Sequence, residues 1–191
     1  MTPTDKRHEI LLAALHLIAE HGFHEAPIAK IAERAGVGAG TIYRYFANKE
    51  ILINELFREH HAKISAVLLV GYREEGPVRE RFLHLGTALL HYFIANPLGF
   101  RFVEQYLNSP YGIAFRKDRL LGKADDEDFC RRLLEEGVSR QVVKELPLVV
   151  LFALAFGPLL AVARDHVSGV VELDEPLIVE TVRACWDSLK R

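Results

Sequence analysis

Cysteine is scarce in this chain of 191 residues, which also has one methionine and one tryptophan. The two cysteines, Cys130 and Cys185, are far apart in the sequence and do not have the spacing of a zinc site. A disulfide-dense secreted fold is therefore disfavoured, and this usage suits a reducing cytosol. We expect a cytoplasmic protein without a cofactor.

A large excess of charge of either sign is also missing. Lysine and arginine number 24, aspartate and glutamate number 26, and the net charge is -2. Residues 1–50 carry six basic and six acidic side chains. Because phosphate attracts positive charge, any contact with nucleic acid must come from a local arrangement of basic groups and not from the overall field.

Long stretches that alternate between apolar and polar residues are absent, as are internal repeats and low-complexity tracts. A sheet is therefore not expected, because a half-buried strand shows a period of two. Apolar residues instead recur three or four positions apart, as Ala14, Leu17 and Ile18 do. His16 and Glu20 interrupt the same stretch, which is thus unlike the unbroken apolar core of a signal peptide. The predicted fold class is all-α, with about nine helices.

One segment lacks charge altogether, the 18 residues from Leu146 to Ala163. Its length lies at the lower limit for a helix that spans a membrane. Pro147, Gly157 and Pro158 interrupt it, and no other segment is similar. A helix that is apolar on all sides can equally be buried inside a protein, and we favour this interpretation over a membrane span.

Glycine and proline divide the N-terminal part of the chain into helices. Thr4 is the expected N-cap of the first helix, and Gly22 supplies the positive φ that its C-terminal cap needs. A second helix has Pro27 in its first turn and ends at Gly36, and a third covers residues 38–46. Two short helices joined by a tight, glycine-containing turn are typical of a helix-turn-helix.

A longer helix connects this module to the rest of the chain. Asn48 is its expected N-cap, and it continues to about Val70. Further along, a turn at Gly137 ends one helix, and Asp174 is the expected N-cap of the last helix. The predicted domains are a helix-turn-helix domain over residues 1–50 with a connector helix over 48–70, and a larger helical domain over 71–191.

The most informative segment is residues 31–50. Ile42 and Phe46 lie four positions apart and would anchor the third helix to the first two. The other faces of that helix carry hydroxyls and a guanidinium, and a lysine follows; such groups contact phosphate. An isolated Tyr-x-Tyr would more often belong to an ordinary surface helix, but the full set of spacings favours DNA. These groups are Thr41, Tyr43, Arg44, Tyr45 and Lys49.

This segment resembles the tetracycline-repressor (TetR) family of bacterial regulators, whose pattern here is Gly-Val-Ser-x-Gly-Thr-x-Tyr-x-x-Phe, followed by Lys-Glu. The resemblance covers about residues 5–56. It implies that the third helix is the recognition helix and that Thr41 and Tyr43 contact backbone phosphate. It also implies that Tyr45 contacts phosphate or a base edge. The expected DNA-binding residues are Arg7, Ala39, Gly40, Thr41, Tyr43, Arg44, Tyr45 and Lys49, with Lys49 clamping a phosphate and Arg7 near the DNA backbone.

Three positions depart from the family pattern. Ala26 stands where the family usually has a Thr or Ser that caps the second helix. Gly38 replaces the usual capping Ser of the recognition helix, which weakens the cap by roughly a few tenths of a kcal/mol. Ala39 replaces a longer polar residue and can meet only a thymine methyl group, so hydrogen-bond readout of a base at this position is lost.

The second domain resembles that of the family only in its number of helices. Aromatic side chains are concentrated between residues 92 and 115, together with the polar groups of His91 and Gln105. An apolar pocket with a few polar groups could form there and bind a small effector, although plain core packing explains the cluster equally well. The expected pocket residues are His91, Tyr92, Phe102, Gln105, Tyr106, Tyr111, Phe152 and Phe156.

The resemblance also implies that the last two helices pair with those of a second chain in a four-helix bundle. This would explain the uncharged segment, because a helix between its own core and a partner has no face in water. The alternative is that the apolar stripe of the last helix belongs to the core of one chain. The expected interface residues are Leu160, Arg164, Ile178, Val182, Trp186 and Leu189.

These features predict a regulator that binds double-stranded DNA at a palindromic operator as a homodimer. We expect a repressor that a small, largely apolar effector releases; the alternative is an effector-independent regulator whose second domain only dimerises or binds a protein. No serine, cysteine or carboxylate constellation suggests an enzyme. His60 and His61 would point about 100° apart on a helix, so no metal site is expected there.

Overall fold

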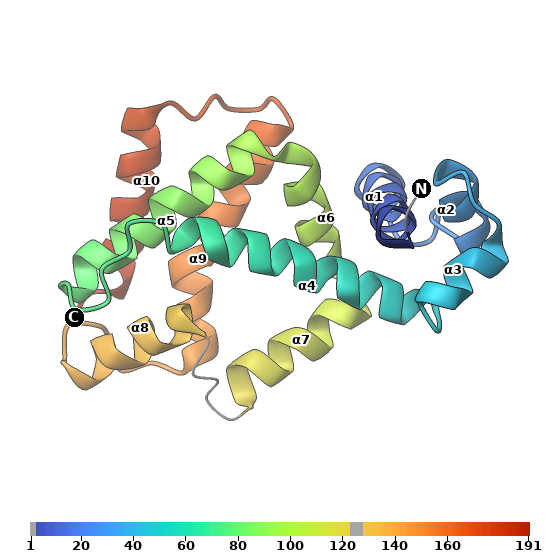
Figure 1. The fold of residues 1–191 in the computed structure, drawn as a ribbon. Coiled ribbons are helices and arrows are strands. Elements are labelled where there is room, and N and C mark those ends of the chain that lie inside the picture. The colour runs from blue at the N-terminus through green and yellow to red at the C-terminus, as the bar shows by residue number, and fades with distance from the viewer. Residues whose placement is uncertain (1–2, 123–127) are drawn as a thin grey trace. The chain divides into compact units, whose positions relative to one another are not determined.

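The computed structural model describes residues 3–122 and 128–191, and in these residues the chain is helical, with no strand (Figure 1). The predicted all-α fold is confirmed, with ten helices in place of about nine. Their bounds are α1 Pro3–His21, α2 Ile28–Arg34, α3 Ala39–Tyr45, α4 Lys49–Leu68, α5 Val78–Ala95, α6 Pro97–Leu107, α7 Pro110–Leu121, α8 Phe129–Ser139, α9 Leu148–Val167 and α10 Glu175–Leu189.

The helices belong to two compact units, and the division differs from the one expected between residues 70 and 71. The first unit consists of Met1–Lys63 and Asn96–Ala114, and the second of Ile64–Ala95 and Phe115–Arg191. The segment Asn96–Ala114 joins the N-terminal helices because α6 packs against α1. Sequence order gives no sign of this contact, since four helices, α2 to α5, lie between α1 and α6 along the chain.

The first unit is built around α1, which packs against α2, α3 and α6. Its residues Ala14 and Ile18 are fully buried. The predicted C-terminal caps are present, because Gly22 has a φ of 77° and Gly36 a φ of 64°. The helix begins at Pro3, so Thr4 lies within its first turn and is not the N-cap.

Helices α4 and α6 meet in the same unit through aromatic side chains. The ring of Phe57 on α4 stacks on Tyr106 of α6, with centroids 3.8 Å apart and planes 7° apart. The Tyr106 hydroxyl donates to Asn54 Oδ1 at 2.9 Å. A turn further along α4, the buried His60 meets Phe102 edge to face at 5.4 Å. Burial of these rings fixes α6 against the first part of α4.

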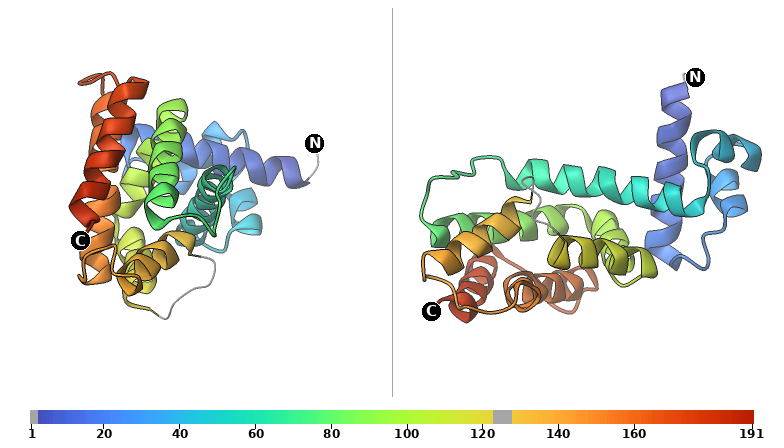
Figure 2. Two further views of the ribbon diagram at one scale, coloured as in Figure 1. Left: turned by 90° about the vertical axis from the view of Figure 1, so that its left-hand side faces the viewer. Right: turned by 90° about the horizontal axis from the view of Figure 1, so that it is seen from below.

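The second unit is centred on α5, which packs against α8, α9 and α10. Gly86 allows the close approach of α10, since a Cβ atom at this position would lie 2.7 Å from Val182 Cγ1. Phe82 contacts Trp186 with ring centroids 5.7 Å apart. Helices α9 and α10 lie side by side in Figure 2. Asp174 caps α10 as predicted, accepting from Leu177 N at 2.9 Å.

The expected turn at Gly137 is wrong. Helix α8 continues through Gly137 to Ser139, and Gln141, with a φ of 58°, lies in the turn that follows. Gly137 is needed for packing: a Cβ atom there would lie 2.6 Å from Val143 Cγ2. A glycine that admits a neighbouring side chain looks, in sequence, the same as one that ends a helix.

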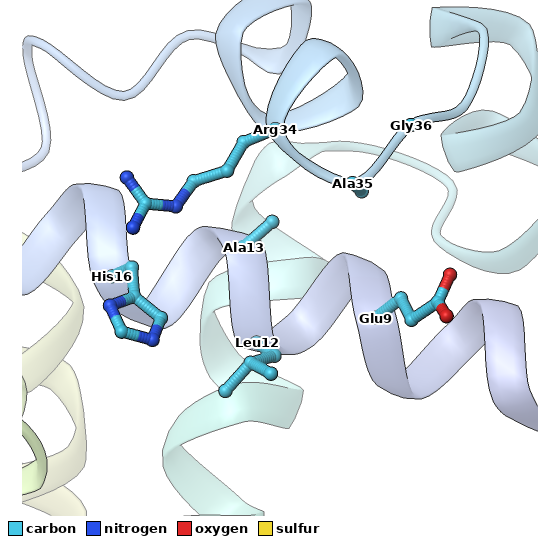
Figure 3. A pocket seen from close by; sticks show the side chains of 7 residues that line it. All are labelled: Glu9, Leu12, Ala13, His16, Arg34, Ala35 and Gly36. Carbon is cyan, nitrogen blue, oxygen red and sulfur yellow. The ribbon is translucent and has the colours of Figure 1, made fainter.

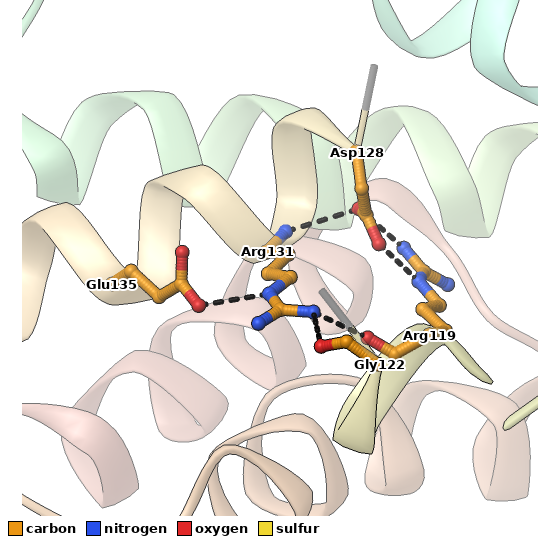
Figure 4. A network of polar contacts seen from close by, with 5 residues as sticks. All are labelled: Arg119, Gly122, Asp128, Arg131 and Glu135. Atoms are coloured by element: carbon orange, nitrogen blue, oxygen red, sulfur yellow. Dashed lines mark hydrogen bonds and ion pairs between the residues drawn. The ribbon is translucent and has the colours of Figure 1, made fainter. Parts of the chain in front are cut away.

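A polar network joins the end of α7 to the start of α8 (Figure 4). Asp128 caps α8 by accepting from Arg131 N at 3.0 Å, and it forms an ion pair with Arg119. Arg131 donates to the carbonyl oxygens of Arg119 at 2.9 Å and Gly122 at 3.2 Å, and to Glu135 at 2.8 Å. Because these carbonyls end α7 without helical partners, Arg131 satisfies them and holds the two helix ends together.

Helix α9 is long and apolar enough, by length and composition, to cross a membrane. Its buried residues all lie on one side, four positions apart, where the helix meets the rest of its unit. The opposite side is apolar yet exposed. The buried residues are Leu151, Ala155, Leu159 and Ala163, and the exposed ones are Val149, Val150, Ala153, Gly157 and Pro158. We call these five residues the outer face of α9.

Candidate nucleic-acid interface

Helix α3 has one buried side and one open side. Ile42 and Phe46 are 0% and 1% exposed, so the anchoring pair predicted from sequence is in the core. Tyr43 is 54% exposed, although tyrosine is a large and partly apolar side chain. The other expected contact residues of α3 are also accessible: Ala39, Gly40 and Arg44 are exposed, and Thr41 and Tyr45 are half-buried. The helix thus presents hydroxyls and a guanidinium to solvent.

The two short helices begin without a side-chain cap. Pro27 is the N-cap of α2, and Gly38, with a φ of -73° and a ψ of 147°, is the N-cap of α3. Ala26 is fully buried, so a capping Thr or Ser is replaced there by an apolar contact. Helix α3 is therefore held in its unit by its buried side chains and not by a capping side chain.

Lys49 lies at the start of α4, directly after the capping Asn48, whose Oδ1 accepts from Ile51 N at 2.9 Å. The Lys49 ammonium donates to the carbonyl oxygen of Phe23 at 2.7 Å. Burial lowers the pKa of Lys49. A lysine has three N–H donors, so this bond leaves two for a phosphate oxygen. Sequence reasoning missed the role of Phe23, because every residue has a backbone carbonyl and the residue type does not show which carbonyl accepts a hydrogen bond.

Arg7 has a different environment from the one expected. Its guanidinium forms ion pairs with Glu55 and with Glu59, the latter at 2.6 Å, and it lies 5.5 Å from the ring centroid of Phe46. The hydrogen bonds that Arg7 donates to Glu59 and Glu55 raise the pKa of Arg7. Arg7 therefore ties α1 to α4, with its charge neutralised by two carboxylates. The spacing of Glu55 and Glu59, one helical turn apart, was the signal that could have indicated this.

An open groove of about 480 Å³ runs along α1 where it faces the loop after α2 (Figure 3). Leu12 and Ala13 line its middle, Glu9 lies toward one end, and His16 and Arg34 lie toward the other. It contains none of the aromatic side chains expected in an effector pocket. The groove is therefore a feature of the helix-turn-helix surface and not the predicted pocket.

Four of the expected pocket residues lie in the first unit. Phe102 and Tyr106 are 0% and 4% exposed, with their rings 6.3 Å apart. Gln105 of α6 and Tyr111 of α7 are more accessible, and both side chains approach the turn between α1 and α2. Tyr111 contacts the ring of Phe23 at 5.6 Å. Within this unit, the four expected residues thus include a buried aromatic pair, Phe102 and Tyr106, and two more accessible residues that approach the turn between α1 and α2.

The other four expected pocket residues lie in the second unit. Phe156 contacts Phe152 at 5.5 Å, and the Arg119 guanidinium lies 4.7 Å from the Phe152 ring centroid. Tyr92 is half-buried, and burial raises its pKa. His91 is exposed and pairs with Glu175 at 2.8 Å, while its expected place in an apolar pocket stays a prediction. His91 occupies the outer side of α5, a placement that its neighbours in sequence do not reveal.

The expected interface residues separate into two groups. Ile178, Val182, Trp186 and Leu189 are at most 6% exposed within one chain, so they belong to the core of that chain, and their expected contact with a second chain stays a prediction. The physical reason is that the apolar stripe of α10 packs on α5 and α9 of its own chain. Leu160 and Arg164 on α9 are half-buried and exposed, respectively, and remain compatible with an interface.

Two family models match the sequence. Residues 10–56 match the model of bacterial regulatory proteins of the tetR family, and residues 77–190 match a tetracyclin repressor-like C-terminal domain. The HTH-type transcriptional regulator YdeS of Bacillus subtilis is 30% identical over 170 residues, which cover 83% of this chain and 80% of YdeS. The fatty acid metabolism regulator protein of B. subtilis is 38% identical over 73 residues, and this alignment spans only 38% of either protein.

Solved structures match over nearly the whole chain. A TetR-family transcriptional regulator from Vibrio parahaemolyticus has a TM-score of 0.78 and 31% sequence identity, covering 98% of this chain and 99% of its own. The fatty acid degradation regulator FadR from Bacillus halodurans has a TM-score of 0.72 and 27% identity, covering 94% of this chain and 97% of FadR.

Proposed function

Because the chain belongs to the TetR family of bacterial regulatory proteins, we propose that it binds double-stranded DNA in the cytoplasm as a homodimeric transcriptional regulator. Family membership also agrees with a regulator and not an enzyme. We further propose that it is a repressor, released from a palindromic operator by a small, largely apolar effector.

The observation that carries the DNA-binding proposal is the open side of α3. Ile42 and Phe46 fix the helix from beneath, while Tyr43 and Arg44 point to solvent. A helix held this way can enter the major groove as a rigid element that presents its open side to the bases. Hydroxyl and guanidinium groups position the protein on phosphates, and Arg44 can also reach a guanine edge.

Replacement of Lys49 by alanine should weaken DNA binding by a similar factor on all sequences. Each lost phosphate contact lowers the slope of log affinity against log salt by about one per half-site. The measurement is fluorescence anisotropy at several salt concentrations, on the duplex that the wild-type protein selects from a random library. Lys63→Ala removes the same charge from an exposed position on the same helix and is the matched control. Unchanged affinity and slope in Lys49→Ala would contradict the assignment of Lys49.

The homodimer is supported by the outer face of α9. Val149 is 43% exposed and Val150 is 38% exposed, and Gly157 and Pro158 are exposed beside them. Exposed apolar patches on soluble proteins mark contact surfaces, because covering them releases water and lowers the free energy of the system. A second copy that presents the same face would cover it symmetrically. This proposal replaces the α10 stripe with the outer face of α9, together with Leu160 and Arg164, as the contact region.

The effector proposal is supported by aromatic side chains in both units and by the relatives whose names refer to fatty acids. Phe102 and Tyr106 in one unit, and Phe152 and Phe156 in the other, supply apolar surface of the kind that lines ligand pockets. An acyl chain is an apolar ligand of the matching chemistry. The exposed side-chain amide of Gln105 is a candidate to fix its orientation.

We expect operator DNA and the effector to weaken each other by the same factor, because coupling between two binding sites is reciprocal. A 100-fold loss of operator affinity corresponds to about 2.7 kcal/mol of coupling. The measurement is calorimetric titration with a series of fatty acids and acyl thioesters, with and without the selected duplex. A ligand that binds with equal affinity in both titrations would show that its site does not regulate DNA binding.

A second candidate is an effector-independent regulator, and one observation favours it. Phe102 and Tyr106 are almost completely buried, and the Tyr106 hydroxyl is satisfied by Asn54 at 2.9 Å. Residues buried in this way can have a purely structural function in the core, without binding a ligand. If the protein binds DNA but binds no member of the ligand series, that result would favour this candidate.

A further inference from the structure

The turn between α1 and α2 contacts both the lysine at the start of α4 and the segment Asn96–Ala114. We propose that Phe23 in this turn is a positioning residue: its carbonyl oxygen holds the Lys49 ammonium in place, and its ring is in turn held by Tyr111. The turn would thus link the state of α6 and α7 to DNA binding. This inference rests on the proposed function, because it takes Lys49 as a phosphate contact.

The first part of the argument is the kind of acceptor that holds Lys49. Phe23 O accepts from Lys49 Nζ at 2.7 Å, which restricts a long side chain that otherwise has many rotamers. A carbonyl is neutral, so the ammonium keeps its full charge for a phosphate. Arg7 shows the contrast: its guanidinium is neutralised by Glu55 and Glu59. Lys49 is therefore oriented by a contact that does not pair it with a carboxylate.

The second part is what fixes the turn itself. Gly22 takes the left-handed conformation, with a φ of 77°, and its N–H donates to Ile18 O at 2.8 Å. Directly after it, the half-buried Phe23 ring meets Tyr111 of α7, with centroids 5.6 Å apart and planes tilted by 58°. Gln105 of α6 also reaches the turn, since a Cβ atom on Gly22 would lie 3.7 Å from its Oε1 atom.

The consequence is a short path between two parts of one compact unit. Residues Tyr111, Phe23 and Lys49 are consecutive contacts, and all three belong to the first unit. A displacement of α7 that releases the Phe23 ring would move the carbonyl oxygen. Hydrogen bonds weaken steeply with distance and angle, so Lys49 would then lose its fixed orientation.

The test is a double-mutant cycle between Tyr111 and Lys49, measured as affinity for the duplex that the wild-type protein selects from a random library. Tyr111→Ala should weaken binding by about threefold in the wild-type background and should have no effect when Lys49 is already alanine. It should also lower the salt slope, which a change in base contacts would not do. Tyr111→Phe keeps the ring and should restore wild-type behaviour.

Ile113→Ala, an exposed position on the same helix, is the matched control and should bind DNA as the wild-type protein does. If Tyr111→Ala does not fold, Tyr111→Leu retains an apolar side chain and replaces it in the cycle. Equal effects of the Tyr111 variant in both backgrounds would overturn the inference while leaving the DNA-binding function intact. If Lys49→Ala alone does not change DNA binding, the premise of the inference, the phosphate contact of Lys49, would instead be removed.

Discussion

Replacement of Gly157 by arginine is expected to convert the proposed dimer into monomers and to lower operator affinity by roughly 100-fold, because a two-site contact becomes a single-site contact. Gly157 lies on the outer face of α9, and no atom lies within 4 Å of a Cβ atom built there. The arginine therefore fits the single chain without strain. At the centre of a symmetric interface, it would place two like charges in an apolar seam.

The measurement is sedimentation velocity, together with anisotropy on the selected duplex. Gly157→Ala is the matched control: it fills the same open space with one methyl group and should remain dimeric. It should also be slightly more stable, because glycine is a poor helix former. A Gly157→Arg protein that sediments as a dimer and binds the duplex normally would exclude the outer face of α9 as the interface.

Replacement of Gly112 by alanine is expected to lower the free energy of unfolding by about 3 kcal/mol and the Tm by about 10 °C. A Cβ atom at Gly112 would lie 2.1 Å from the carbonyl oxygen of Tyr106 and 2.6 Å from Leu107 Cα. Both atoms belong to the backbone at the end of α6, so they are unable to turn away as a side chain would. The chain must shift where the Phe57 and Tyr106 rings stack.

Thermal and urea unfolding followed by circular dichroism measure this loss. Gly99→Ala is the matched control in α6 of the same unit, because its Cβ atom would be 3.6 Å from His60 Nε2, an ordinary contact distance. We expect this control to match the wild-type protein or to exceed its stability slightly. Similar melting of the two variants would mean that the connection near Gly112 adapts more easily than its geometry indicates.

Local chemistry determined the elements that could be predicted from the sequence. Gly22 and Gly36 end their helices because glycine adopts the left-handed conformation without a steric penalty. Asp174 caps α10 because its carboxylate accepts a hydrogen bond from a free N–H of the first turn. Ile42 and Phe46 are buried because residues four apart share a helix face. Each of these features depends on neighbours within a few positions.

Only the tertiary structure decided features that depend on distant partners. The spacing of Trp186 on α10 indicated a buried stripe, but it could not tell whether α5 of the same chain or a second chain covers it. Gly137 looked like a helix end, and the approach of Val143 showed that it is a packing site. Arg7 was expected near the DNA backbone, and only the fold showed that α4 places Glu55 and Glu59 beside it. Periodicity states which face is buried, while the partner of that face depends on how the whole chain folds.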